Sequence, residues 1–92
     1  MVSFNRKSKK SVETSDPKKE GKHLILHNDS INTFEYVIDT LCEVCNHNEA
    51  QAEQCALITH HKGKCDIKKG SWEDLAIIKK KLIRRKLSVT ID

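Results

Sequence analysis

One stretch of the sequence joins the end of an apolar segment to the start of a capped helix: Leu26-His27-Asn28-Asp29-Ser30-Ile31-Asn32-Thr33-Phe34-Glu35-Tyr36. Before it, residues 23–27 form a short apolar run bounded by polar residues, which is typical of a strand. After it, Asn32 with Glu35 three positions later is a capping-box arrangement and predicts a helix over residues 33–45. An Asn-Asp pair therefore lies at a strand-to-helix corner.

A second corner lies at residues 59–65, Thr59-His60-His61-Lys62-Gly63-Lys64-Cys65. Asn48 with Gln51 repeats the capping signal, and the small or apolar residues that follow at helical spacing predict a helix ending near His61. Gly63 is the expected stop, because glycine readily adopts the left-handed conformation that ends helices. Residues 64–68 then predict a second strand.

The last third of the chain predicts one more helix and one more strand. After a turn at Gly70, Ser71 with Asp74 caps a helix whose expected buried stripe is Leu75, Ile78, Leu82 and Ile83. Beyond it, apolar and polar residues alternate over residues 87–91, as in a half-buried strand. The order β-α-α-β-α-β predicts an α/β (α+β) fold, a two-layer open sandwich. In it a three-stranded antiparallel sheet is covered on one face by three helices.

Composition allows one small domain and an N-terminal tail. The chain has 92 residues with 37% hydrophobic content, too few for a second core. Residues 1–21 are dominated by Lys, Ser, Asp and Glu, so we expect a flexible tail, with the folded core at residues 22–92. Residues 1–22 hold seven Lys/Arg against three Asp/Glu, whereas residues 23–92 hold ten of each. The formal charge of +4 therefore belongs to residues 1–22.

Several classes of protein do not fit the sequence. No apolar run has the roughly 20 residues of a membrane span, and the first residues lack the apolar core of a secretory signal. We therefore expect a cytoplasmic protein whose four cysteines are reduced thiols. No nucleophile and base pair, phosphate loop or paired catalytic acids indicates an enzyme, and no cofactor is expected.

The two corners supply acceptors for a cationic ligand. An α-ammonium group has three N–H donors and a positive charge, and a selective site for it needs an amide oxygen, a carboxylate and a neutral imidazole nitrogen. Asn28, Asp29 and His60 are such a set. The alternative is structural: Asn28 and Asp29 build an Asx-type turn, and His60 is a satisfied histidine at a helix end. Spacing alone favours the alternative.

Several separated blocks in order carry a resemblance to a known family. The chain has Asn28-Asp29-Ser30, Asn32-Thr33-Phe34, Val37-Ile38-Asp39 and then His60-His61-Lys62-Gly63-Lys64-Cys65. Over about residues 23–92 it resembles the Clp protease adaptor family (ClpS), which selects proteins by their N-terminal residue. Compared with many relatives, Ser30 replaces a second Asp, Phe34 a common Met, and Ala56 a larger apolar residue.

The resemblance implies a function and a site. Asn28 and His60 match residues that bind the α-amino group of the N-terminal degradation signal (N-degron), and Asp29 matches one that fixes the start of the bound peptide. A hydrophobic pocket for a bulky first side chain (Leu, Phe, Tyr or Trp) would be formed by Phe34, Val37, Leu41, Ala56, Thr59 and Leu87. The implied partners are N-degron substrates and the N-terminal domain of a Clp-family Hsp100 ATPase of the ClpA or ClpC type. No nucleic acid or membrane partner is expected, and the protein would be a monomer.

Two other features have alternative interpretations. Cys42-x-x-Cys45 near His47 has the spacing of a zinc half-site, but the cysteines fall on the apolar helix stripe, which favours core packing and no metal. Lys79-Lys80-Lys81 and Arg84-Arg85-Lys86 suggest a small nucleic-acid or ribosome-associated domain that uses the basic third helix. In the adaptor interpretation the same helix, around Lys79, docks on the ATPase.

Overall fold

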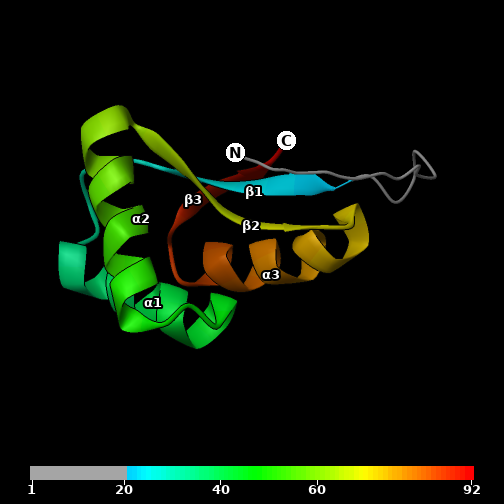
Figure 1. Ribbon diagram of the computed structural model, residues 1–92, viewed down its shortest axis with the longest axis horizontal. Coiled ribbons are helices and arrows are strands. Elements are labelled where there is room, and N and C mark those ends of the chain that lie inside the picture. The colour runs from blue at the N-terminus through cyan, green and yellow to red at the C-terminus, as the bar shows by residue number, and fades with distance from the viewer. Residues whose placement is uncertain (1–20) are drawn as a thin grey trace, which may run out of the picture.

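The computed structural model describes residues 21–92, so the tail expected over residues 1–21 falls outside it apart from Gly21. The predicted order of elements is confirmed, with bounds β1 Lys22–His27, α1 Phe34–Cys45, α2 Glu49–Lys62, β2 Lys64–Gly70, α3 Trp72–Arg84 and β3 Ser88–Ile91. Figure 1 shows these elements as one body with the sheet above α1 and α3.

The sheet is antiparallel with strand order β2-β1-β3, so the first strand is central. Both neighbours pair with β1: Leu26 lies opposite Cys65 on β2 and opposite Val89 on β3. A register shift between Leu24 and Ile25 marks a bulge in the β1–β2 pairing. The central strand therefore delivers residues 26–28 to one end of the sheet, between its two neighbours.

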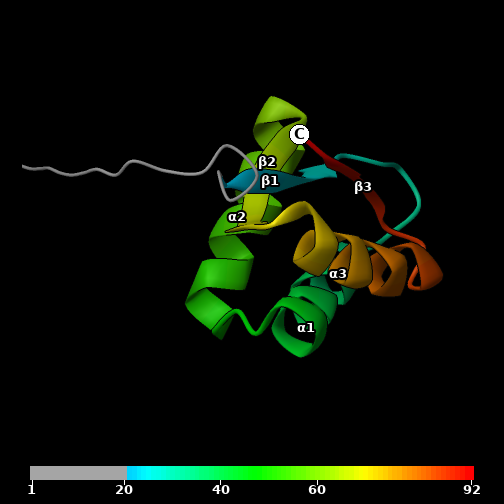
Figure 2. The ribbon, with the colours of Figure 1, turned by 90° about the vertical axis from the view of Figure 1, so that its right-hand side faces the viewer.

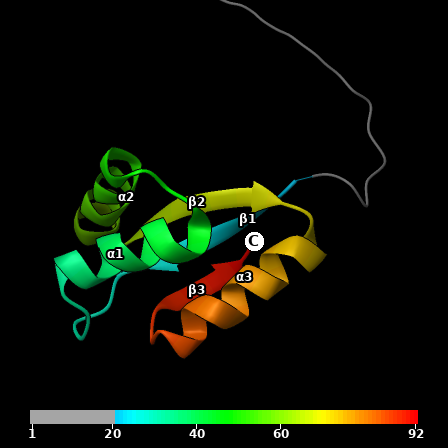
Figure 3. The same ribbon diagram turned by 90° about the horizontal axis from the view of Figure 1, so that it is seen from below.

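α1 and α3 lie on one side of the sheet at two levels, and α2 stands at the end of the sheet beside β2 (Figure 1, Figure 2). Turned by 90°, the molecule shows α3 beneath the strands and α1 further from them (Figure 2). α3 contacts all three strands, α2 contacts β2, and α1 packs against α2 and α3 (Figure 3). The side chains that are almost entirely buried at this junction are Leu24, Leu26, Leu41, Leu75 and Leu82.

The cap predictions hold for two helices and fail for one. Asn48 and Ser71 cap α2 and α3 as predicted, each accepting a hydrogen bond from the backbone N–H three residues later. The cap of α1 is Thr33, whose hydroxyl accepts from the Tyr36 N–H, and the prediction of Asn32 was wrong by one residue. Asn and Thr both cap helices well, and the Asn32 side chain instead donates to the Asp29 carboxylate and to the distant Lys86 carbonyl.

The predicted buried stripe of α3 is also wrong at one position. Leu75 and Leu82 are fully buried, whereas Ile83 is 50% exposed. Successive residues of a helix differ in direction by about 100°, so the position after Leu82 turns away from the sheet. Leu87, beyond the helix, is buried in its place.

The cysteines behave as apolar core residues. All four are free thiols, and Cys45, Cys55 and Cys65 are buried. Burial raises the pKa of Cys45 to about 11 and that of Cys65 to about 12, so both thiols are uncharged at neutral pH. His47, two residues after Cys45, is also buried, and its Nε2–H donates to the Ile67 carbonyl over 2.7 Å. Within residues 21–92, no three His, Cys, Asp or Glu side chains gather as a metal site requires.

Candidate functional site

The two corners singled out in the sequence are joined in the structure. The backbone N–H of Asn28, just after β1, donates to the Gly63 carbonyl at the end of α2 over 2.9 Å. Gly63 has a left-handed φ of 91°, and its N–H donates to the Thr59 carbonyl, which closes the last turn of α2. This turn carries His60, so the fold brings His60 to the same end of the sheet as Asn28 and Asp29.

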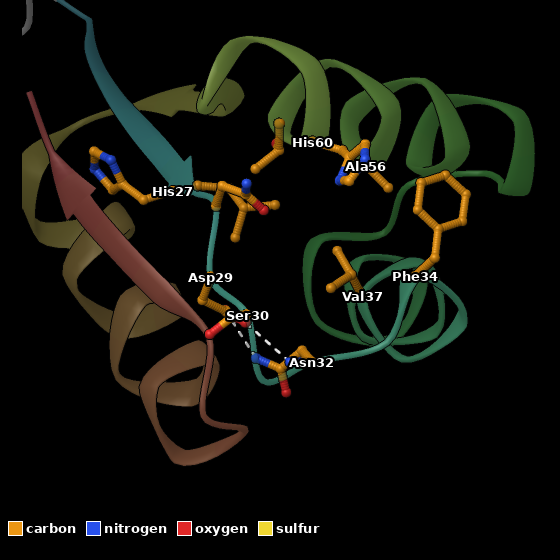
Figure 4. A pocket seen from close by; sticks show the side chains of 11 residues that line it. His27, Asp29, Ser30, Asn32, Phe34, Val37, Ala56 and His60 are labelled. Carbon is orange, nitrogen blue, oxygen red and sulfur yellow. Dashed lines mark hydrogen bonds between the residues drawn. The ribbon is translucent and has the colours of Figure 1, made fainter.

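A pocket of about 390 Å³ opens where these corners meet. Its lining comes from the end of β1, the loop after it, α1 and α2: Leu26, His27, Asn28, Asp29, Ser30, Asn32, Phe34, Val37, Ala56, Thr59 and His60. Figure 4 shows Phe34 and Val37 of α1 facing Ala56 and His60 of α2 across this space. The pocket is thus a cleft between two helices, bordered at its mouth by the loop after β1.

The helical walls of the pocket are mostly apolar. Phe34 and Val37 are partly buried, and Ala56 and Thr59 are buried at 4% and 5% exposure. The Thr59 hydroxyl donates to the Cys55 carbonyl over 2.7 Å, so its single proton is used inside the helix. Such a wall favours an aliphatic or aromatic group over a polar one.

The loop after β1 supplies the polar part of the lining. One carboxylate oxygen of Asp29 accepts from the backbone N–H groups of Ile31 and Asn32, each at 2.9 Å, and the other accepts from the Asn32 side chain at 3.0 Å. These bonds form the Asx-type turn that the structural alternative predicted. Partial burial raises the pKa of Asp29, but the hydrogen bonds from Asn32 and Ile31 outweigh it, and the pKa lies below its usual value.

This loop is also tied to the turn between α3 and β3. The side-chain amide of Asn32 donates to the Lys86 carbonyl over 2.9 Å, and the Tyr36 hydroxyl donates to the Arg85 carbonyl over 2.8 Å. Lys86 has a left-handed φ of 72°. Arg85 in turn forms an ion pair with Glu43 of α1 at 2.8 Å. The end of α3 therefore supports the loop from behind.

The structure brings most of the predicted site residues together. Asn28, Asp29 and His60 line one pocket with four of the six predicted wall residues, Phe34, Val37, Ala56 and Thr59. Leu41 does not line it, because its side chain is completely buried in the core. Leu87 lines a separate hollow with Ile31 and Ile83. Lys79 lies on α3, an element that contributes nothing to the pocket.

Sequence reasoning missed other lining residues. Leu26 is the last inward-facing residue of β1, and its position beside the Asn-Asp pair was a sufficient signal. Asn32 was assigned to helix capping, which concealed its place in the pocket lining. His27 lies at the rim, but its imidazole points away from the pocket toward β3 and is hydrogen-bonded to the Thr90 hydroxyl at 2.7 Å (Figure 4).

The arrangement suits a ligand with an apolar body and a cationic end. The polar groups of Asn28, Asp29 and His60 lie at the mouth of an apolar cleft, and His60 is solvent-exposed. Across residues 21–92, no helix has the length and apolar character needed to cross a membrane.

Comparison with known proteins places this chain in a family. No curated protein sequence matches the chain. A solved structure of Agrobacterium tumefaciens ClpS2 bound to L-phenylalaninamide is similar, with a TM-score of 0.68 and 18% sequence identity. The match covers 82% of this chain and 96% of that one, and it shows the fold. The model of the ATP-dependent Clp protease adaptor protein ClpS matches residues 18–90, so the chain belongs to the ClpS family.

Proposed function

We propose that this protein is an adaptor that binds the bulky hydrophobic N-terminal residue of a substrate protein and delivers it to a Clp Hsp100 ATPase-protease. The observation that carries the proposal is the pocket of about 390 Å³, with apolar walls and with Asn28, Asp29 and His60 at its mouth, in a chain of the ClpS family. The ligand of the similar ClpS2 structure, L-phenylalaninamide, has a matching shape: a benzyl group beside a free amine.

Each end of the ligand has a counterpart in the site. The first side chain would enter between α1 and α2, where burial at roughly 25 cal/mol per Å² contributes roughly 1.5 to 3 kcal/mol. The α-ammonium would donate to the Asn28 amide oxygen and the His60 imidazole, beside the Asp29 carboxylate. An internal residue of a protein has no ammonium group and would leave these acceptors unpaired, which is why only chain termini bind.

Delivery needs a second surface. We assign ATPase docking to α3 around Lys79, because α3 contributes no residue to the pocket and the adaptor can hold both partners at once. The role requires no chemical step, so the protein acts without enzymatic activity or a cofactor. We place it in the cytoplasm as a monomer whose folded core is residues 22–92.

A titration of labelled peptides tests substrate binding. A peptide beginning with Phe or Leu should bind, and N-acetylation should abolish binding because it removes the charge and two donors. His60→Ala or Asn28→Ala should weaken binding by about tenfold or more. His61→Ala is the matched control, since His61 is the neighbouring exposed histidine and does not line the pocket. Equal affinity for the acetylated peptide would refute the ammonium site.

A degradation assay tests delivery separately. A reporter protein with an N-terminal Phe is incubated with the adaptor and a Clp ATPase-protease. Lys79→Glu should slow degradation while leaving peptide affinity unchanged, because Lys79 is outside the pocket. Lys64→Glu, on β2, is the control for a charge reversal elsewhere on the surface. Unchanged degradation with Lys79→Glu would remove Lys79 from the docking surface.

A further inference from the structure

The side chain of Asn32 bridges the pocket loop and the end of α3. Its amide nitrogen donates to Asp29 Oδ2 over 3.0 Å and to the Lys86 carbonyl over 2.9 Å, and these two contacts use both of its N–H groups. The dashed lines in Figure 4 show the contacts between Asn32 and Asp29. The anchor at Lys86 lies 54 positions further along the chain, so the bridge is a tertiary contact.

The bridge determines how the Asp29 carboxylate is oriented. Two backbone N–H groups, those of Ile31 and Asn32, already occupy Oδ1. Among residues 21–92, Oδ2 accepts a hydrogen bond only from the Asn32 side chain, and each carboxylate oxygen has room for about two hydrogen bonds. One acceptor position on Oδ2 is therefore left for a ligand, and the Asn32 amide fixes the rotation of the carboxylate that presents it.

We propose that Asn32 is a positioning residue of the amine-binding site. It uses the Lys86 carbonyl as a fixed point to hold the Asp29 carboxylate at the mouth of the pocket. The inference rests on the proposed function, since it presumes that a ligand ammonium binds beside Asp29. It extends that function to the α3–β3 turn, which becomes part of the support of the site.

Partial burial raises the pKa of Asp29, and hydrogen bonds from Asn32 and Ile31 lower it further than burial raises it. Titratable groups from several elements lie around this carboxylate. His60 of α2 and His27 of β1 line the same pocket, and Lys86 lines the hollow on the other side of Asp29. The hydrogen bond from the Asn32 side chain is among the contacts that lower the pKa of Asp29. Removing that bond should therefore raise the Asp29 pKa while the histidines and Lys86 remain in place.

Tyr36 offers a control that separates two possible roles of Asn32: orienting the Asp29 carboxylate, and merely attaching the pocket loop to the α3–β3 turn. Tyr36 makes the other side-chain hydrogen bond to the α3–β3 turn, through its hydroxyl to the Arg85 carbonyl, and does not touch Asp29. Tyr36→Phe therefore weakens the attachment of α1 to this turn but leaves the carboxylate as it is. Asn32→Ala removes both amide contacts, and Asn32→Asp keeps the size while replacing the donor with a second carboxylate.

The experiment measures two quantities for each variant: affinity for a peptide beginning with Phe, and the Asp29 pKa from the ¹³C shift of its carboxyl carbon. Asn32→Ala should weaken binding about tenfold and raise the Asp29 pKa, and Asn32→Asp should weaken it further. Tyr36→Phe should change affinity by less than about twofold and leave the Asp29 pKa unchanged. If Asn32→Ala does not fold, Asn32→Ser tests the same loss of the amide.

Two results would overturn the inference: wild-type affinity in Asn32→Ala, or an equal loss in Tyr36→Phe, which would show a structural tether only. Failure of the proposed function has a different signature. In that case the wild-type protein itself would bind free and acetylated peptides alike. The NMR titration would still report whether Asn32 controls the Asp29 carboxylate.

Discussion

The N–H of Asn28 and the carbonyl of Gly63 are joined by a 2.9 Å hydrogen bond that fastens the end of β1 to the end of α2. Both partners are main-chain groups, so the bond persists whatever side chain residue 28 carries. The bond therefore does not use the side chain of Asn28. This is why Asn28→Ala is expected to affect binding without opening the corner.

Replacing Gly63 with any residue that has a side chain should destabilise the protein. An added Cβ would meet no atom within 4 Å, so the cost of Gly63→Ala comes from its φ of 91°. We expect the free energy of unfolding to fall by about 1 to 2 kcal/mol, measured by urea denaturation. Gly70→Ala is the control, because its Cβ would lie in ordinary contact, 3.7 Å from Leu75 Cδ2, and its φ is not left-handed. Equal losses in both variants would contradict the conformational explanation.

Ala56 should control the size of the first residue that fits. Its side chain is 4% exposed and lines the pocket, so Ala56→Leu places three more carbon atoms in the cleft. Affinity for a peptide beginning with Trp should fall by about tenfold or more, and by less for one beginning with Leu. Ala50→Leu, exposed near the start of the same helix, should change neither affinity. A uniform loss for all first residues would argue against a steric effect.

Lowering the pH should remove the contribution of the Asp29 carboxylate to the free energy of unfolding. Partial burial raises the pKa of Asp29, but the hydrogen bonds of its loop outweigh burial and hold that pKa below its ordinary value in the folded state. A depressed carboxyl pKa contributes stability above the unfolded pKa and loses it as pH falls through the folded pKa. Asp29→Asn should therefore be less stable than the wild type at neutral pH, and the difference should shrink below about pH 4. A difference that stays constant in urea denaturation across this range would contradict the assignment.

Replacing Lys86 with glycine should stabilise the folded protein. Its φ of 72° is unfavourable for a residue with a Cβ, and relief of this strain exceeds the entropy that glycine adds to the unfolded chain. Lys86→Gly should raise the free energy of unfolding by about 0.5 to 1 kcal/mol. Asn46→Gly is the comparison: Asn46 also has a positive φ, of 59°, but asparagine tolerates it, so no gain is expected. Thermal denaturation of both variants tests this expectation, and an equal gain in Asn46→Gly would contradict it.

Local patterns were sufficient for the elements of the fold. The caps Asn48 and Ser71 lie next to the helices they begin, and the alternation in β3 repeats within a few residues. Each signal is short-range, so the sequence contains it completely. The start of α1 was misplaced because Asn32 and Thr33 are both good capping residues, and the choice depends on the Lys86 carbonyl, which is remote in sequence.

The pocket could be predicted only in part for the same reason. Residues 28–29 and 60 could be singled out as candidates because they stand at corners, but spacing alone favoured a structural role, and the family resemblance was needed to select them. The structure places all three in the lining of one pocket. Leu41 was expected in the wall, yet the packing of α1 against its neighbours turns it wholly into the core. Which side of a helix faces a cleft and which faces the core depends on helix crossing, and a single apolar stripe does not specify it.

The helical walls of the pocket are built by α1 and α2, whereas the polar part of its lining comes from the loop after β1 and from His60 in the last turn of α2. Under the proposed function, preference among first residues would therefore depend on wall residues such as Phe34 and Ala56, and the requirement for a free amine on Asn28, Asp29 and His60. Natural variation at Phe34 or Ala56 can change the repertoire of client proteins while their common entry requirement is retained. Adaptors with this arrangement could therefore change which N-terminal residues they accept while still requiring a free N-terminus.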